Sequence, residues 1–146
     1  MVPTTSTAAA AGTVRPSALL APLGVWLVLA VLAVANGAFR EVVLIPRVGE
    51  HTGHVVSTLV LVAVIFAVSA AFFASTDAQY ATAELVTIGV VWTVLTVGFE
   101  FLVGYVEGTP VSVTVGQYDV FAGQVWILVP LSLLVAPLVF GRAFAG

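Results

Sequence analysis

Four long apolar segments constrain the fold of this chain more than any other feature of its sequence. Each has about the 20 residues that a helix needs to cross a hydrocarbon core of about 30 Å. Because lipid offers no hydrogen bonds to the backbone, such segments fold as helices, whose peptide groups bond to one another. The sequence therefore predicts an all-α fold, a four-helix transmembrane bundle with helices over residues 18–39, 54–74, 83–106 and 121–142.

The composition supports this class of protein. Hydrophobic residues make up 61% and charged residues 8% of the chain, whereas soluble domains average about 25% charged residues. The chain has no cysteine, which excludes thiolate metal sites and iron–sulfur clusters. It has no basic run and none of the common hydrolase, zinc-protease or phosphate-loop motifs. We expect the lipid bilayer as partner and no nucleic acid.

The domain organisation is expected to be simple. A disordered tail over residues 1–16, rich in small and polar residues, precedes one transmembrane domain over residues 17–146. The connections over residues 40–53, 75–83 and 107–120 are short, so consecutive helices should be antiparallel, in an up-down-up-down order.

The orientation and the first segment each leave an alternative open. Arg15 and Arg142 lie on the side of the termini and Arg40 and Arg47 on the other, so the count of cations is tied. Discounting Arg40 as a buried, paired residue favours cytoplasmic termini in a multi-pass protein of the cell membrane. The first segment could instead be a cleaved signal peptide, although it exceeds the about 7–15 apolar residues of a signal core.

Polar residues gather at one end of the predicted bundle, here called the distal end, which holds the connections 40–53 and 107–120. A path for ions through a membrane usually needs polar groups along its whole length. The one-sided arrangement therefore predicts a half-membrane binding site or a structural clamp. The residues of this predicted cluster are Asn36, Arg40, Glu41, His54, Glu100, Tyr118, Asp119 and Gln124.

Glu100 is the first candidate within the cluster, because a carboxylate inside a membrane helix costs about 2.5 kcal/mol or more and needs a partner. It belongs to a stripe of small and polar residues, spaced three and four apart, that runs from Gly89 to Glu107. Arg40 is the expected partner at similar depth, and Asn36, one turn earlier, could orient it. The pair could stabilise the fold or contact a ligand, substrate or ion.

Two histidines raise the question of a metal. His51 and His54, three residues apart, would form a two-nitrogen clip on one helical face. A hydrogen-bonded histidine at the membrane interface is the alternative. We expect no cofactor, because a haem held by two histidines needs both rings at membrane depth on different helices.

The segment before the fourth helix contains Tyr118, Asp119 and Trp126. Asp119 could cap the helix, and the two aromatic residues suit the aromatic belt of a membrane interface. Alternatively, Tyr118 and Asp119 fold over the polar cluster as a lid.

Several of these motifs resemble those of a family of small, uncharacterised prokaryotic membrane proteins with four predicted spans. The resemblance covers about residues 36–142 and implies the same four-span fold. The family has no established activity, so the resemblance implies no reaction. The residues that carry it are Asn36, Gly37, Arg40, Glu41, His54, Glu100, Gly104, Tyr118, Gly123 and Trp126.

Three functions are compatible with these features. The first is a binding or accessory protein whose cluster holds a small polar ligand, a lipid headgroup or a partner helix. The second is a subunit of an oligomeric transporter or channel that uses Glu100. The third is a membrane enzyme acting on a lipid or quinone, with Glu100 or His54 in acid–base chemistry. A homo-oligomer or a larger membrane complex is compatible with all three.

Overall fold

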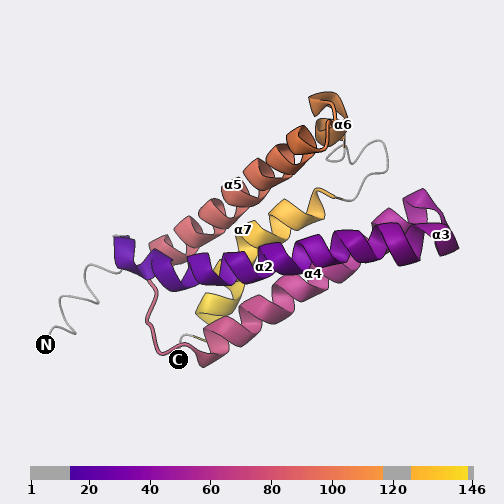
Figure 1. Cartoon of the computed structure of the whole chain (residues 1–146). Helices are drawn as coiled ribbons and strands as arrows, with labels where there is room; N and C mark the ends of the chain where they lie inside the picture. Colours follow the sequence, from indigo (N-terminus) through magenta and orange to yellow (C-terminus); the bar gives the residue numbers. More distant parts are fainter. Residues whose placement is uncertain (1–13, 117–125, 145–146) are drawn as a thin grey trace, which may run out of the picture.

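The computed structural model describes residues 14–116 and 126–144, and the regular elements in that part of the chain are all helical, as predicted (Figure 1). In chain order they are η1 (Pro16–Leu19), α2 (Leu20–Phe39), η2 (Arg40–Leu44), α3 (Ile45–Val48), α4 (Glu50–Ser75), α5 (Thr82–Val106), α6 (Val111–Gly116) and α7 (Leu128–Ala143).

Among the described residues, three helical segments are long and apolar enough, by length and composition, to cross a membrane. They are Pro16–Val48, Glu50–Ser75 and Thr82–Val106. The first three predicted helices are therefore confirmed as long apolar helices. The apolar α7 is shorter, with 16 residues. The fourth helix was predicted to begin at residue 121, but residues 126 and 127 form a turn and the helix begins at Leu128. Residues 121–125 lie outside the described part of the chain.

The first connection is almost entirely helical, and the predicted loop over residues 40–53 is wrong. The segment after α2 continues as the π-helical η2 and then α3, because residues 42–45 are all apolar and extend the helix. The π-helical turn ends at Leu44, two residues before Pro46, whose ring nitrogen has no hydrogen to donate to the carbonyl four residues earlier. The chain reverses at Gly49, whose φ of 90° few other residues adopt.

The later connections agree in part with the prediction. Residues 76–81 join α4 to α5 without regular structure, as expected for the second connection. The predicted loop over residues 107–120 instead contains α6 over Val111–Gly116.

Arg15 and Glu84 fix the start of the first helix against the start of α5. The Arg15 guanidinium donates to both Glu84 carboxylate oxygens, from Nε at 2.7 Å and from Nη2 at 2.9 Å. The backbone N–H groups of Arg15 and Ala81 donate to the same carboxylate. The Glu84 side chain is fully buried. Residues 1–13 of the predicted tail lie outside the described residues, but the tail does not extend to Arg15, which is held in place.

Glycines set the closest helix contacts. Figure 1 shows α7 lying between α4 and α5, and it packs against both. A methyl group added at Gly89 of α5 would overlap the carbonyl oxygen of Leu134, so the two backbones approach as closely as glycine permits. One turn on, the Thr93 hydroxyl donates to the carbonyl of Pro130 at 3.3 Å. The predicted stripe on α5 therefore faces α7 in its first half.

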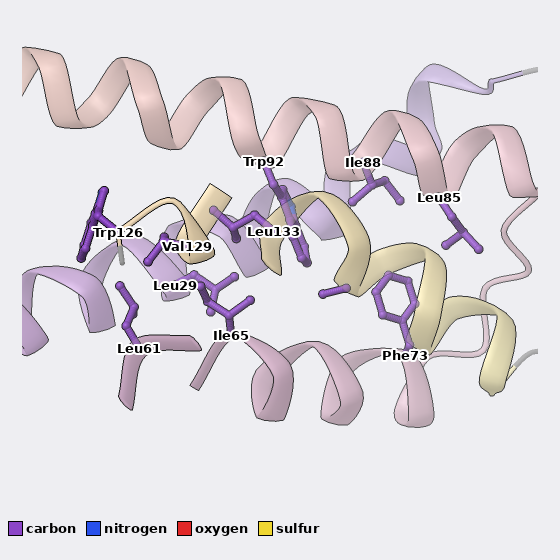
Figure 2. Close-up of a cluster of buried hydrophobic side chains, with 11 residues drawn as sticks. Leu29, Leu61, Ile65, Phe73, Leu85, Ile88, Trp92, Trp126, Val129 and Leu133 are labelled. Carbon is purple, nitrogen blue, oxygen red and sulfur yellow. The ribbon is translucent and has the colours of Figure 1, made fainter. Parts of the chain in front are cut away.

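The hydrophobic core takes side chains from α2, α4, α5 and α7. Figure 2 shows Trp126 and Leu61 at one end of this cluster and Phe73 and Leu85 at the other. Trp92 lies between them, is fully buried, and donates from Nε1 to the carbonyl of Pro22 at 2.9 Å. The end of the molecule near η1 is thus filled by packed side chains.

Candidate functional site

A cavity of about 580 Å³ lies between α2 and α5, with α4 and α7 behind it. α2 and α5 make few contacts with each other and diverge toward the distal end, as Figure 1 shows. Most of the lining is apolar. Its charged, histidine and hydroxyl side chains, within the part of the chain that the structure describes, are Arg40, Glu41, His54, Thr96, Glu100, Glu107 and Thr109. Four residues of the predicted cluster therefore face one cavity.

Two hydrogen bonds define how α2 and α5 lie along each other. The Trp92 Nε1 donates to the Pro22 carbonyl, and the Trp26 Nε1 donates to the Thr96 hydroxyl, each at 2.9 Å. Both pairs are 70 residues apart in sequence. The two helices therefore run in the same direction, and a residue of α2 lies at the level of the α5 residue 70 positions later. The level of Glu100 on α5 therefore corresponds to Ala30 on α2.

This offset explains why Arg40 does not form an ion pair with Glu100. Arg40 lies ten residues beyond Ala30, a helical rise of about 15 Å. Within the described part of the chain, the Arg40 ion pair is with Glu41, at 3.2 Å between Nε and Oε2. The prediction that Arg40 pairs with Glu100 at similar depth is wrong. The cavity is instead elongated, with Arg40 toward its distal end and Glu100 deeper.

Arg40 is also held by a small hydrogen-bond network on α4. Its Nη1 donates to the hydroxyl of the buried Ser57 at 3.3 Å, and Ser57 donates to the Asn36 carbonyl oxygen Oδ1 at 2.8 Å. The Asn36 amide donates back to the Ser57 backbone carbonyl at 3.1 Å. Asn36 therefore does help to place Arg40, as predicted, but through Ser57, which the sequence reasoning missed.

Trp126 is a hydrogen-bond partner of Glu100. Its Nε1 donates to Oε1 at 2.6 Å, and the residue is only 9% exposed. The expectation that Trp126 anchors a membrane interface is therefore wrong; burial against α4 and α5 gives its indole N–H a carboxylate to bond. The ring also contacts His54, with centroids 5.6 Å apart.

His54 is half-buried on the cavity wall, and its Nε2 is buried with no hydrogen-bond partner among the described residues. His51 is exposed and does not line the cavity. In residues 14–116 and 126–144, no three histidines or acidic residues gather as a metal site would need. A metal clip of His51 and His54 thus has no third ligand within that part of the chain.

Three residues of the predicted cluster, Tyr118, Asp119 and Gln124, lie outside the described residues. The sequence reasoning also missed members of the cavity wall. Trp26 and the small residues Ala30, Ala33 and Gly37 face it from α2. Their spacing of three and four residues is the helical period that would have indicated a common face.

Comparison with protein families, curated proteins and solved structures finds no match. The resemblance to a four-span prokaryotic family stays a prediction.

Proposed function

We propose that this chain is a multi-pass membrane protein that binds a small amphipathic molecule in the cavity between α2 and α5. The observation that carries the proposal is the cavity itself. Its volume of about 580 Å³ is within the about 300–1,000 Å³ typical of small-molecule sites. Its lining combines an apolar wall with Arg40, Glu41, His54 and Glu100, which suits a molecule with an apolar chain and a polar head.

The proposal includes four membrane-crossing helices in an up-down order, with α7 as the fourth. Support comes from the outer surface, where large apolar side chains are exposed on every long helix. Leu27 and Val31 on α2 are 60% and 68% exposed, and Leu102 on α5 is 58% exposed. A soluble monomer rarely carries such a continuous apolar surface. Lipid chains would cover it without cost.

The arginines no longer favour cytoplasmic termini. That expectation depended on discounting Arg40 as paired. Arg15 is paired with Glu84 as closely as Arg40 is with Glu41. Both paired arginines are therefore left out of the count of cations, one on each side of the membrane. Arg47 and Arg142 remain, one on each side.

Binding is better supported than conduction through a single chain. A conducting path needs polar groups at successive depths of the membrane. Near η1 the interior of the described chain is instead packed with apolar side chains such as Trp92 and Leu85, both fully buried. The cavity therefore lies toward the distal end and is closed off by packed side chains near η1.

The topology can be tested with cysteines, since the chain has none of its own. Single cysteines at Ala78, between α4 and α5, and at the exposed Ser112 of α6 should react with a membrane-impermeant maleimide from opposite sides of the membrane. Labelling of both from one side of sealed vesicles would contradict the proposed up-down order.

The binding site can be tested with a photoreactive fatty alcohol that carries a diazirine. We expect it to label residues of the cavity wall. Ala30→Trp fills the cavity at the level of Glu100 and should abolish that labelling. Ala35→Trp, on an exposed face of the same helix, is the matched control and should leave it unchanged. Equal labelling of the wall in both variants would refute the proposal.

A further inference from the structure

We infer that the cavity selects a molecule with a positively charged head, an amine or a quaternary ammonium on an apolar chain. The inference rests on the proposed binding function and adds the chemical class of the ligand. It follows from a count of the charges that face the cavity and of the cations in the whole sequence.

The described residues of the cavity wall carry more negative than positive charge. Arg40 and Glu41 are paired and neutralise each other. Glu100 and Glu107 also line the cavity. Glu100 lies on α5 and Glu107 directly follows its last residue, so the two are seven positions apart, about 10 Å along the helix axis. α5 ends at Val106, so the partial negative charge of its C-terminus adds to that of Glu107.

Among the described residues, the other three arginines lie away from the cavity wall. The sequence has no lysine and four arginines. Arg15 pairs with Glu84, Arg47 donates to the carbonyl of Val43, and Arg142 lies in the last turn of α7. None of these three lines the cavity. Residues 1–13 and 117–125 contain no arginine, lysine or histidine at all. The wall therefore keeps an excess of negatively charged side chains, which favours a cationic ligand.

The cavity also offers surfaces that accept an ammonium group. Trp26, Phe99 and Trp126 are on its wall. An ammonium over an aromatic face gains about 0.5–2 kcal/mol, and more where water is excluded. Trp26 and Phe99 meet edge to face at 6.2 Å between centroids, on the α2 and α5 sides of the cavity. The apolar wall beyond them, which includes Leu29 and Leu133, suits a hydrocarbon chain.

The test is competition against the diazirine alcohol in micelles of a neutral maltoside detergent, with two probes of equal chain length and opposite charge. Decyltrimethylammonium should displace the alcohol from the cavity at a concentration at least about tenfold lower than decyl sulfate. That ratio corresponds to about 1.4 kcal/mol. The Glu100→Gln and Glu107→Gln variants should each reduce it several-fold. Glu107 is exposed, so its variant should fold even where Glu100→Gln does not.

A third variant and a second ligand complete the design. Glu50→Gln removes an exposed carboxylate that does not line the cavity and should leave the ratio unchanged. Phosphatidylethanolamine, compared with phosphatidylglycerol of the same chains, tells a membrane lipid from a free amphiphilic amine. If the ethanolamine lipid displaces the diazirine alcohol, the bound cation is a lipid headgroup. If only decyltrimethylammonium displaces it, the ligand is a free amphiphilic amine.

The outcomes separate the two proposals. Equal displacement by the cation and the anion, with labelling still lost in Ala30→Trp, would overturn the charge selectivity and leave the binding site intact. Wall labelling that Ala30→Trp does not change would overturn the proposed function and this inference with it.

Discussion

Trp126 and Glu100 are joined by a hydrogen bond of 2.6 Å between the indole Nε1 and the carboxylate Oε1. The bond links the turn before α7 to the C-terminal half of α5, at the cavity wall. A hydrogen bond to a carboxylate is stronger than one between neutral groups, and both residues lie in a largely apolar setting. Glu100 is thus tied to the core cluster as well as to the cavity.

Loss of this donor should destabilise the protein. Trp126→Phe keeps the ring but removes the N–H, and we expect a loss of about 1–3 kcal/mol in the free energy of unfolding. The measurement is an SDS titration in mixed micelles. In a Glu100→Gln background the same change should cost less, because the acceptor is then neutral. An equal cost in both backgrounds would show that the bond contributes nothing specific.

Arg40 and Glu100 should be energetically independent. Residues more than about 10 Å apart without shared partners usually have additive effects on stability, within about 0.5 kcal/mol. We expect Arg40→Gln and Glu100→Gln to add in this way when their unfolding free energies are compared with the double variant. A coupling well above that limit would mean that the two side chains do meet in the folded protein.

The ion pair between Arg15 and Glu84 should contribute measurably to the free energy of unfolding, because the Glu84 side chain is buried. Glu84→Gln leaves Arg15 without a carboxylate, and the Arg15 side chain keeps 37% exposure. We expect a loss of about 1–3 kcal/mol, less than for a pair buried at both ends. Glu50→Gln, an exposed carboxylate in the first turn of α4, is the matched control and should change stability by less than about 0.5 kcal/mol.

Two glycines of α5 should respond in opposite directions to the same change. Gly89→Ala places a methyl group on the Leu134 carbonyl oxygen, and overpacking of this kind costs about 1–3 kcal/mol. Gly98→Ala, on the same helix, meets open space and should gain up to about 1 kcal/mol from helix propensity. Thermal unfolding of the two purified variants in one detergent gives the comparison. Similar shifts would contradict the close contact of α5 with α7.

The polar cluster could be predicted in outline because charges in an apolar chain are rare and their positions along the predicted helices give their approximate depth. Arg40, Glu41, His54 and Glu100 do line one cavity. Their partners could not be predicted. Ser57 and Trp126 look in sequence like an ordinary helix residue and an interface anchor, and only packing gives them Arg40 and Glu100 as neighbours.

The buried Glu84 was missed for a related reason. Near the end of a predicted helix, a glutamate is usually a solvated residue or a cap. Here the chain before α2 folds across the start of α5, so that Arg15 covers the carboxylate. No local pattern indicates a contact between residues 69 positions apart.

The sequence by itself determined that the chain is helical, where its long apolar helices lie, and that most of its polar residues gather toward one end. These properties depend on local composition and on the backbone's need to bond to itself in an apolar setting. Only the tertiary structure decided the axial offset of α2 and α5, their divergence, and hence the cavity and the separation of Arg40 from Glu100. The helical period fixes which residues share a face, but the sliding and tilt of one helix on another are set by many packed contacts at once, such as Gly89 on Leu134 and Trp92 on Pro22.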